Sequence, residues 1–274
     1  MISSGASTFT GNREETKRSA IHKALFFVRW QLIPVAVSLP SHIAFVFRGL
    51  RGSRAKPLQR LKLAWLSASI HLKLECGHNP EEVLRVLEEI VELPPEAPGV
   101  VVECGAFLGG SSAKLSHAVS MTGRKLLVCD SFEGLPIVGT ANHISDKPNF
   151  KSGEYAGRLP DVAANIERFG KIDCVEFIQG WYEDTLGQLA GIPIACAFWD
   201  VDLRESFLSC IEALWPQIAS GAKVFLHDVD RQPVVTVFED ADWWGKQFDC
   251  DPPKFVGARV GLGRLSPLMG YVIK

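Results

Sequence analysis

The sequence predicts an α/β fold in which a mostly parallel sheet is covered by helices on both faces. Short apolar runs rich in β-branched residues alternate with stretches of helical spacing from residue 99 onward, a pattern typical of parallel strands joined by helices. The first run, residues 99–104, carries Glu103 near its end and leads into a turn at Gly105 and a helical segment. A buried strand, a tight turn and a helix N-terminus form the nucleotide-binding crevice of such sheets.

Local signals place the elements in chain order. Asn79, Pro80 and the two acids after them indicate a helix start, because an Asn cap, a proline at the first position and early acids all favour a helix N-terminus. The predicted helices cover residues 57–74, 79–90, 110–121, 160–169, 183–190, 205–218 and 233–244, and the predicted strands cover residues 99–104, 125–130, 175–178, 194–199, 223–226, 255–262 and 269–273. The last two strands have no helix between them, so we expect an antiparallel hairpin at the sheet edge. A long polar loop occupies residues 133–159, and its part from Ile137 to Leu159 is placed to close over an acceptor.

Composition limits the classes of function. The 274 residues carry a formal net charge of −2, which gives no electrostatic reason to expect a nucleic-acid partner. The seven cysteines are scattered, and several lie inside apolar runs, so we expect buried thiols in a reducing compartment, the cytoplasm.

The N-terminal 56 residues are predicted to be an extension of a domain that covers residues 57–274. No Asp, Glu, Lys or Arg occurs from Trp30 to Phe47, and Arg29 and Arg48 flank this stretch. Prolines and polar residues interrupt it, which favours a helical extension that packs on the domain or on a second subunit over a membrane span. A homo-oligomer is therefore expected. A peripheral membrane contact through residues 24–50 is the alternative, because basic flanks around an apolar stretch also fit an interfacial anchor.

The turn after the first strand argues against a dinucleotide. The fingerprint G-x-G-x-x-G requires a second glycine where the backbone approaches a pyrophosphate, and this chain has Phe107 there. A bulky residue suits a ligand without pyrophosphate, such as S-adenosylmethionine, whose ammonium group suits the carboxylate of Glu103.

Chemistry-bearing residues follow the other strands. Asp130 ends the second strand and is placed to accept hydrogen bonds from ribose hydroxyls. Trp181 follows the third strand, where it could stack on adenine or serve as an ordinary core aromatic. The fourth and fifth strands end in Asp200-Val201-Asp202 and His227-Asp228. These side chains could hold a divalent metal ion, or they could cap helices and remain solvated.

Three strings of the sequence resemble the macrocin O-methyltransferase family over roughly residues 75–245: Val102-Glu103-Cys104-Gly105 with Gly109-Gly110, Asp130-Ser131-Phe132-Glu133-Gly134-Leu135-Pro136, and Gly180-Trp181-Tyr182-Glu183-Asp184-Thr185-Leu186. The resemblance implies a class I methyltransferase with a Rossmann-like, seven-stranded sheet and a reversed last strand. It also implies dependence on S-adenosylmethionine and Mg²⁺ and methylation of sugar hydroxyls on natural products. Together with the strand ends, it predicts a cofactor site at Glu103, Gly105, Ala106, Gly109, Ser111, Asp130, Ser131, Phe132, Gly180, Trp181 and Asp200.

The sequence departs from the family pattern in the half of the site that meets the acceptor. The family's two adjacent acids after the fifth strand fall on His227 and Asp228, so one acid has become histidine. We predict metal ligation of Mg²⁺ or Mn²⁺ by Asp200, His227 and Asp228. Asp202 and His227 are the candidate general bases that would take the proton from an acceptor hydroxyl.

Three functions are compatible with the sequence. An O-methyltransferase acting on a small-molecule hydroxyl is favoured. An NAD(P)-dependent oxidoreductase is disfavoured by Phe107 and by the absence of a Tyr-x-x-x-Lys pair. The third is a non-catalytic cofactor-binding or membrane-peripheral homologue, which the altered acids and the apolar N-terminal stretch suggest.

Overall fold

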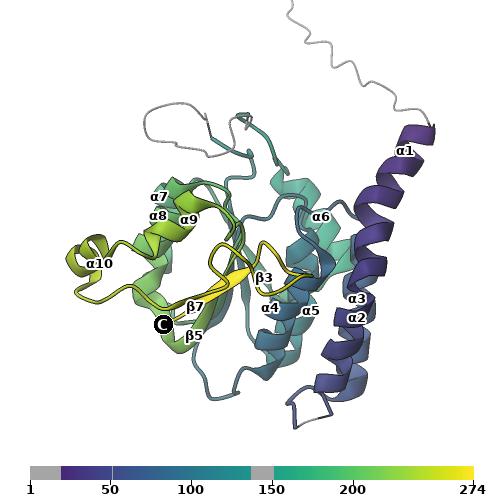
Figure 1. Cartoon of the computed structure of the whole chain (residues 1–274), viewed down its shortest axis with the longest axis horizontal. Helices are drawn as coiled ribbons and strands as arrows, with labels where there is room; N and C mark the ends of the chain where they lie inside the picture. Colours follow the sequence, from purple (N-terminus) through teal and green to yellow (C-terminus); the bar gives the residue numbers. More distant parts are fainter. Residues whose placement is uncertain (1–19, 51, 137–150) are drawn as a thin grey trace, which may run out of the picture.

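A computed structural model describes residues 20–50, 52–136 and 151–274, with side chains from residue 24, and it contains a seven-stranded sheet (Figure 1). The strands are β1 (Val100–Cys104), β2 (Leu126–Asp130), β3 (Val175–Gln179), β4 (Ile194–Trp199), β5 (Ile218–Leu226), β6 (Phe255–Val256) and β7 (Gly270–Ile273). They lie in the order β3-β2-β1-β4-β5-β7-β6. The first five pair in parallel, whereas β7 runs antiparallel to both β5 and β6. The predicted mostly parallel sheet with a reversed last strand is confirmed.

Helices cover both faces of this sheet, as predicted. The described helices are α1 (Ala20–Phe27), η1 (Val28–Leu32), α2 (Ile33–Arg48), α3 (Pro57–His71), α4 (Pro80–Glu92), α5 (Gly110–Thr122), α6 (Leu159–Phe169), η2 (Ile172–Cys174), α7 (Tyr182–Thr185), η3 (Leu186–Leu189), α8 (Arg204–Leu214), η4 (Trp215–Gln217), α9 (Gln232–Val237) and α10 (Ala241–Phe248). Buried side chains of α4, α5 and α6 form one apolar cluster with the sheet, and those of η3, α8, α9 and α10 form the other. Helices α1, α2 and α3 form a further layer outside α4 and α5 (Figure 1).

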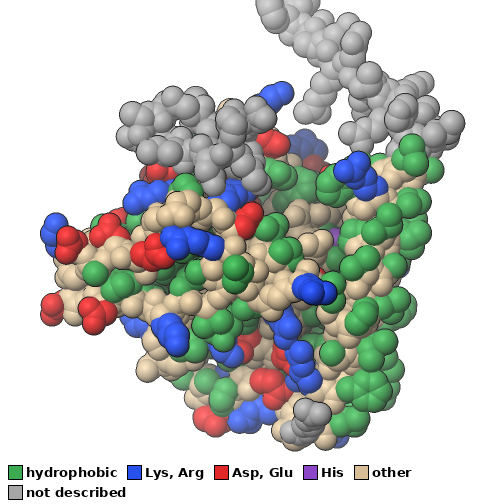
Figure 2. Space-filling view, in the orientation of Figure 1, with side chains coloured by type: hydrophobic (Ala, Val, Ile, Leu, Met, Phe, Trp, Pro, Cys, Tyr) green, Lys and Arg blue, Asp and Glu red, His purple; other side chains and the backbone are tan. Residues whose placement is uncertain are grey.

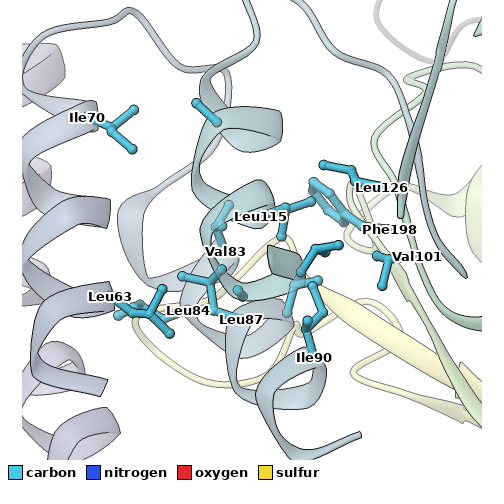
Figure 3. Packing of buried hydrophobic residues seen from close by; sticks show 14 of the residues in the cluster. Leu63, Ile70, Val83, Leu84, Leu87, Ile90, Val101, Leu115, Leu126 and Phe198 are labelled. Carbon is cyan, nitrogen blue, oxygen red and sulfur yellow. The ribbon is translucent and has the colours of Figure 1, made fainter. Parts of the chain in front are cut away.

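Period-two alternation along the strands divides the core into these two clusters. Val101 of β1 packs toward α4 and α5, whereas Val102 packs toward α8, and both are 0% exposed. Figure 3 shows Leu63 and Ile70 of α3 reaching toward α4, so the outer helical layer is continuous with the first cluster. The central strands β1 and β4 are apolar except for Glu103, which explains why they could be read from the sequence.

Several predicted boundaries were wrong, each for a local reason. The helix predicted over 233–244 is two helices, because the side chain of Asp240 accepts a hydrogen bond from the Trp243 amide and caps a new helix. The strand predicted over 255–262 ends at Val256, because Gly257 and Gly261 take left-handed conformations with φ of +94° and +70°. Strand β5 begins at Ile218, within the helix predicted over 205–218, which ends at Leu214 and continues as η4.

The extension is joined to the rest of the chain through a buried arginine. Arg60 of α3 is 2% exposed, and its guanidinium donates to the Phe45 carbonyl of α2 at 2.9 Å. The same side chain pairs with Glu88 at 3.3 Å and Glu92 at 2.5 Å, both on α4. Arg60 therefore ties α2 to α3 and α4, and the division into an extension and a domain at residue 57 stays a prediction.

Replacing Arg60 with Ala should lower the free energy of unfolding by about 2–3 kcal/mol, because a buried carbonyl loses its donor and two carboxylates each lose one of their partners. The figure lies at the lower end for a buried pair, since Glu88 and Glu92 can regain water when they are 22% and 33% exposed. Urea denaturation would measure the change. Arg85→Ala is the matched control, because that side chain is 38% exposed and lies 3.9 Å from Glu88. Equal effects of the two substitutions would contradict the role given to Arg60.

Candidate cofactor and acceptor site

A cavity of about 430 Å³ lies at the carboxyl ends of β1 to β5, where open α/β sheets bind their ligands. Its size falls in the range of small-molecule sites. The predicted residues that line it are Gly105, Ala106, Ser111, Asp130, Ser131, Gly180, Trp181, Asp200, Asp202, His227 and Asp228. Three predicted residues do not line it: Glu103, Gly109 and Phe132. The strand ends thus bring most of the predicted site together.

The turn after β1 owes its shape to glycine. Gly105 has a φ of +93°, and a Cβ at this position would collide with the carbonyl oxygen of Asp200. The Asp200 amide donates to the Cys104 carbonyl at 2.9 Å, so the ends of β1 and β4 meet too closely for a side chain between them. Phe107 also has a positive φ, +48°, and its ring meets Tyr155 edge to face at 5.7 Å.

Asp130 performs a structural task that the sequence did not reveal. One carboxylate oxygen accepts from the Ala106 amide at 2.6 Å, and the other accepts from the Phe132 amide at 2.7 Å. The carboxylate therefore connects the turns that follow β1 and β2. Burial raises the pKa of Asp130, and these amide donors oppose the shift. Each oxygen keeps acceptor capacity for a ligand hydroxyl.

Glu103 lies behind the cavity wall and is 0% exposed. Burial raises the pKa of this carboxyl to about 7, and the nearby hydroxyls of Ser111 and Ser112 on α5 oppose that shift. The Glu103 side chain does not line the cavity, and its contact with a ligand ammonium group stays a prediction.

Trp181 lies where adenine recognition was predicted. It follows Gly180 at the end of β3, it lines the cavity, and its carbonyl accepts from the Thr185 hydroxyl at 2.8 Å. Gly180 has a φ of +142°, and a Cβ there would lie 2.5 Å from Thr185 Cγ2. Trp181 is only partly buried, so its ring is not a simple core aromatic.

Three potential metal ligands meet at the ends of β4 and β5. His227 Nδ1 lies 3.0 Å from Asp200 Oδ1 and 3.5 Å from Asp228 Oδ1, and one atom from each side chain falls within 4.8 Å of the others. His227 and Asp228 can face one point because the chain leaves the extended conformation at Asp228, whose φ is +60°. Two carboxylates and an imidazole are a donor set that fits a divalent cation.

The imidazole of His227 supplies positive charge among these acids. Its Nε2 lies 3.5 Å from Glu82 of α4, a carboxylate that is 0% exposed. Burial lowers the pKa of His227, but Asp200, Asp228 and Glu82 together outweigh that effect and raise it well above its usual value. A metal ion at this point would compete with the proton on His227.

Arg231 is the main site residue that the sequence reasoning missed. Its guanidinium lies 2.8 Å from Asp228 Oδ1 and 3.2 Å from Asp202 Oδ1, and it also donates to the Asp202 carbonyl at 2.5 Å. Burial and the charges of Asp200 and Asp228 raise the pKa of Asp202 to about 7. The position of Arg231, three residues after Asp228 on the same loop, was the available signal.

A second buried polar group borders the cavity through Cys76 and His78. Lys114 of α5 is 1% exposed, and its Nζ lies 2.9 Å from His78 Nε2, 3.4 Å from His71 Nδ1 and 3.6 Å from Cys76 Sγ. The histidine and cysteine atoms are close enough to hold a metal ion, but the Lys114 amine already lies among them. No sequence pattern marked this group.

Residues 81–242 match the model of the family described as macrocin-O-methyltransferase (TylF), which is more than half of the chain. The chain belongs to the macrocin O-methyltransferase family. The resemblance noted in the sequence is confirmed. The matched range contains strands β1 to β5 and the cavity-lining residues from Gly105 to Arg231.

Two similar proteins are named as methyltransferases of natural products. A tetracenomycin 4'-O-methyltransferase of Streptomyces olivaceus, which acts on a dimethoxyrhamnosyl derivative, is 38% identical over 138 residues, covering 48% of this chain and 53% of that protein. The demethyldecarbamoylnovobiocin O-methyltransferase of Streptomyces niveus is 27% identical over 54% of this chain and 58% of that protein. The match therefore spans little more than half the length of these curated relatives.

Solved structures of methyltransferases share the fold. The O-methyltransferase NovP has a TM-score of 0.54 and 22% identity over 71% of this chain and 78% of its own. The calicheamicin methyltransferase CalS11 has a TM-score of 0.53 and 17% identity over 85% of this chain and 91% of its own. Both have the class I methyltransferase architecture, which confirms the predicted fold class.

Glu103→Gln should make the stability of the protein less dependent on pH. The wild-type carboxyl titrates near 7 when folded and near 4.5 when unfolded, so the folded state binds more protons between these values. Wild-type stability therefore falls as pH rises from 4.5 to 7, by on the order of 2 kcal/mol. Denaturation at pH 5 and pH 8 should show the variant gaining more on the wild type at pH 8 than at pH 5. A gain that is equal at both pH values would refute the titration of Glu103.

Proposed function

We propose that this chain is an S-adenosylmethionine-dependent O-methyltransferase that methylates a hydroxyl of a small molecule, a sugar or another natural product. The observation that carries the proposal is the family match over residues 81–242, which encloses a cavity bordered by the turn at Gly105, Asp130 and Trp181. The relatives named for tetracenomycin and novobiocin substrates support the substrate class.

The residues that would hold the cofactor lie along β1, β2 and β3. The carboxylate of Asp130 would accept ribose hydroxyls, and the ring of Trp181 would stack on adenine. The amides of the Gly105–Ala106 turn and the start of α5 at Ser111 would face the methionine part, with Glu103 providing negative charge behind the wall. When bound, S-adenosylmethionine supplies an electrophilic methyl group.

The residues that would act on the acceptor lie along β4 and β5. Asp202 lies at the cavity surface and has a pKa raised to about 7, which suits a group that takes the hydroxyl proton near neutral pH. Arg231 orients that carboxylate through its contacts to the side chain and carbonyl of Asp202. His227 is the alternative base.

Asp200, His227 and Asp228 would hold a divalent metal ion, Mg²⁺ or Mn²⁺. Such an ion, when bound, supplies a Lewis acid that lowers the pKa of a hydroxyl. The nitrogen ligand biases the site toward Mn²⁺ relative to a site of oxygens alone.

We place the enzyme in the cytoplasm, because none of its seven cysteines forms a disulfide and six of them are at least partly buried. The partner of the site is a small-molecule hydroxyl acceptor rather than a nucleic acid, since the chain carries a net charge of −2. We propose residues 57–274 as the methyltransferase domain, with the helices before Pro57 as an extension.

Calorimetry with S-adenosylhomocysteine, S-adenosylmethionine and NAD⁺ tests the cofactor. We expect both sulfur ligands to bind and NAD⁺ not to bind, because Phe107 stands where a pyrophosphate needs glycine. Asp130→Ala should weaken binding by about 1–3 kcal/mol through lost charge-assisted hydrogen bonds. Asp161→Ala is the control, because that carboxylate on α6 is 54% exposed and lies outside the cavity. Preferential binding of NAD⁺ would overturn the proposal.

Metal removal tests the second half of the site. Methyl transfer to a panel of deoxysugar-bearing acceptors should fall sharply in EDTA and return with Mg²⁺ or Mn²⁺, because the acceptor hydroxyl would lose its Lewis acid. Asp228→Asn should abolish the metal response, whereas Asp230→Asn, an exposed acid two residues away, should keep it. Full activity in EDTA, with no Mn²⁺ bound by electron paramagnetic resonance, would show that the metal assignment is wrong and leave Asp202 or His227 as an unaided base.

A further inference from the structure

The N-terminal helices carry a large apolar surface that the domain does not cover. This outer face consists of the exposed apolar side chains of residues 25–50 together with Leu58, Leu61 and Trp65 of α3. Trp30 and Trp65 are 56% and 64% exposed, although tryptophan side chains in water-soluble proteins are mostly buried. Figure 2 shows apolar side chains gathered along the outer edge of the molecule over these helices. A continuous apolar surface of this kind marks a binding surface.

The polar residues of α2 point away from this surface. Ser38 is 2% exposed and donates to the Val35 carbonyl at 2.9 Å, and His42 is 7% exposed and bonds to the Ser38 carbonyl at 2.9 Å. Ser41 donates to Glu81 of α4 at 3.4 Å. The residues that seemed to interrupt the apolar stretch in the sequence therefore line its inner side, and the outer side is more apolar than the sequence indicated.

The N-terminal helical segment carries charge of one sign. Residues 16–74 contain eleven Lys or Arg and no Asp or Glu, whereas the rest of the chain contains 18 Lys or Arg and 31 Asp or Glu. Arg29, Arg54, Lys56 and Lys62 are exposed next to the apolar side chains. Apolar side chains bordered by cations are complementary to a lipid surface that presents acyl chains beneath anionic headgroups.

We propose that the outer face binds the surface of an anionic lipid bilayer, with the helices lying in the interface. Helix α2 does not leave the domain to span the membrane, because Phe45 is 2% exposed and its carbonyl accepts from buried Arg60. The 25-residue apolar segment Ala24–Arg48 is long enough for a span, but this packing keeps its second half on α3 and α4. A helix that lies in the plane of the membrane interface can contact lipid along its apolar side while its second half stays packed on α3 and α4.

A second copy of this chain fits the outer face less well than lipid does. Two copies paired through this face would bring together the exposed cations Arg29, Arg54, Lys56 and Lys62 of each copy. Like charges around an interface oppose association. The first half of the long helix also exposes apolar side chains around most of its circumference, at Leu25, Val28, Trp30 and Ile33, which suits immersion better than a one-sided contact.

Vesicle flotation with the full chain tests the proposal. We expect the protein to float with vesicles of phosphatidylcholine containing about 30% phosphatidylglycerol and to bind pure phosphatidylcholine much more weakly. Binding should fall as salt rises from about 0.1 M to 0.5 M, because screening weakens the contribution of the arginines and lysines. Failure to bind anionic vesicles, or equal binding to both kinds, would overturn the proposal.

Variants separate the apolar from the electrostatic contribution. The double variant Trp30→Gln, Ile33→Gln should partition into vesicles at least about tenfold more weakly. It replaces two exposed apolar side chains that the proposal places within the lipid. Val260→Gln is the matched control, since Val260 is 75% exposed outside the face and should leave partitioning unchanged. Arg29→Gln and Arg54→Gln should each reduce anionic binding by up to about fivefold. Unchanged binding of S-adenosylhomocysteine by each variant would confirm that the domain is intact.

Sedimentation velocity without lipid separates lipid binding from self-association. The proposal expects the mass of the protein to be the same for the wild type and the double variant. A dimer that the double variant converts to a monomer, together with no vesicle binding by the wild type, would show that the outer face is an interface between copies. These outcomes are independent of the methyl-transfer proposal, because neither residue lies at the cavity.

Discussion

The parallel pairing of β1, β4 and β5 concentrates negative charge at one edge of the sheet, and the rest of the site depends on how that charge is balanced. Register places Asp200 and His227 directly after paired strand ends, and the turn at Asp228 brings a second carboxylate to the same point. Glu82 of α4 lies on the other side of His227, next to its Nε2 atom. Carboxylates this close cannot all remain ionised without cations among them. Among the described residues, the imidazole of His227 and the guanidinium of Arg231 lie directly between them.

These two cations share Asp228 and otherwise contact different carboxylates. His227 lies between Asp200, Asp228 and Glu82, whereas Arg231 connects Asp228 to Asp202. A metal ion at Asp200 and Asp228 would replace the proton of His227 but would leave Arg231 beside Asp202. The histidine in place of a family acid therefore lowers the charge that a metal must balance. Without an ion, His227 and Arg231 hold these acids in place, and Arg231 orients Asp202.

The sequence predicted the strand ends well, because they follow from local pattern. Fully buried runs such as residues 194–199 and the glycine turn at Gly105 are visible without any tertiary contact. What it missed arises from contacts between distant residues. Glu82 lies 145 positions before His227 and reaches it only because α4 packs on the sheet. Asp130 looked like a ribose ligand, and its bonds to the amides of Ala106 and Phe132 appear only when two turns meet. The cap at Asp240 split a helix whose apolar spacing continued.

The same limit applies to the N-terminal helices, where sequence composition mixed two faces. Hydropathy over residues 24–48 counts Ser38, Ser41 and His42 against a membrane contact, although these side chains bond inward to α2 and α4. The packing that turns them inward is fixed by Arg60, whose carboxylate partners lie on α4. Because the inner side of these helices packs on α4, the outer side cannot bury its apolar residues against the same domain. In the proposed binding mode a lipid surface covers it, and the one-signed charge of residues 16–74 favours an anionic surface.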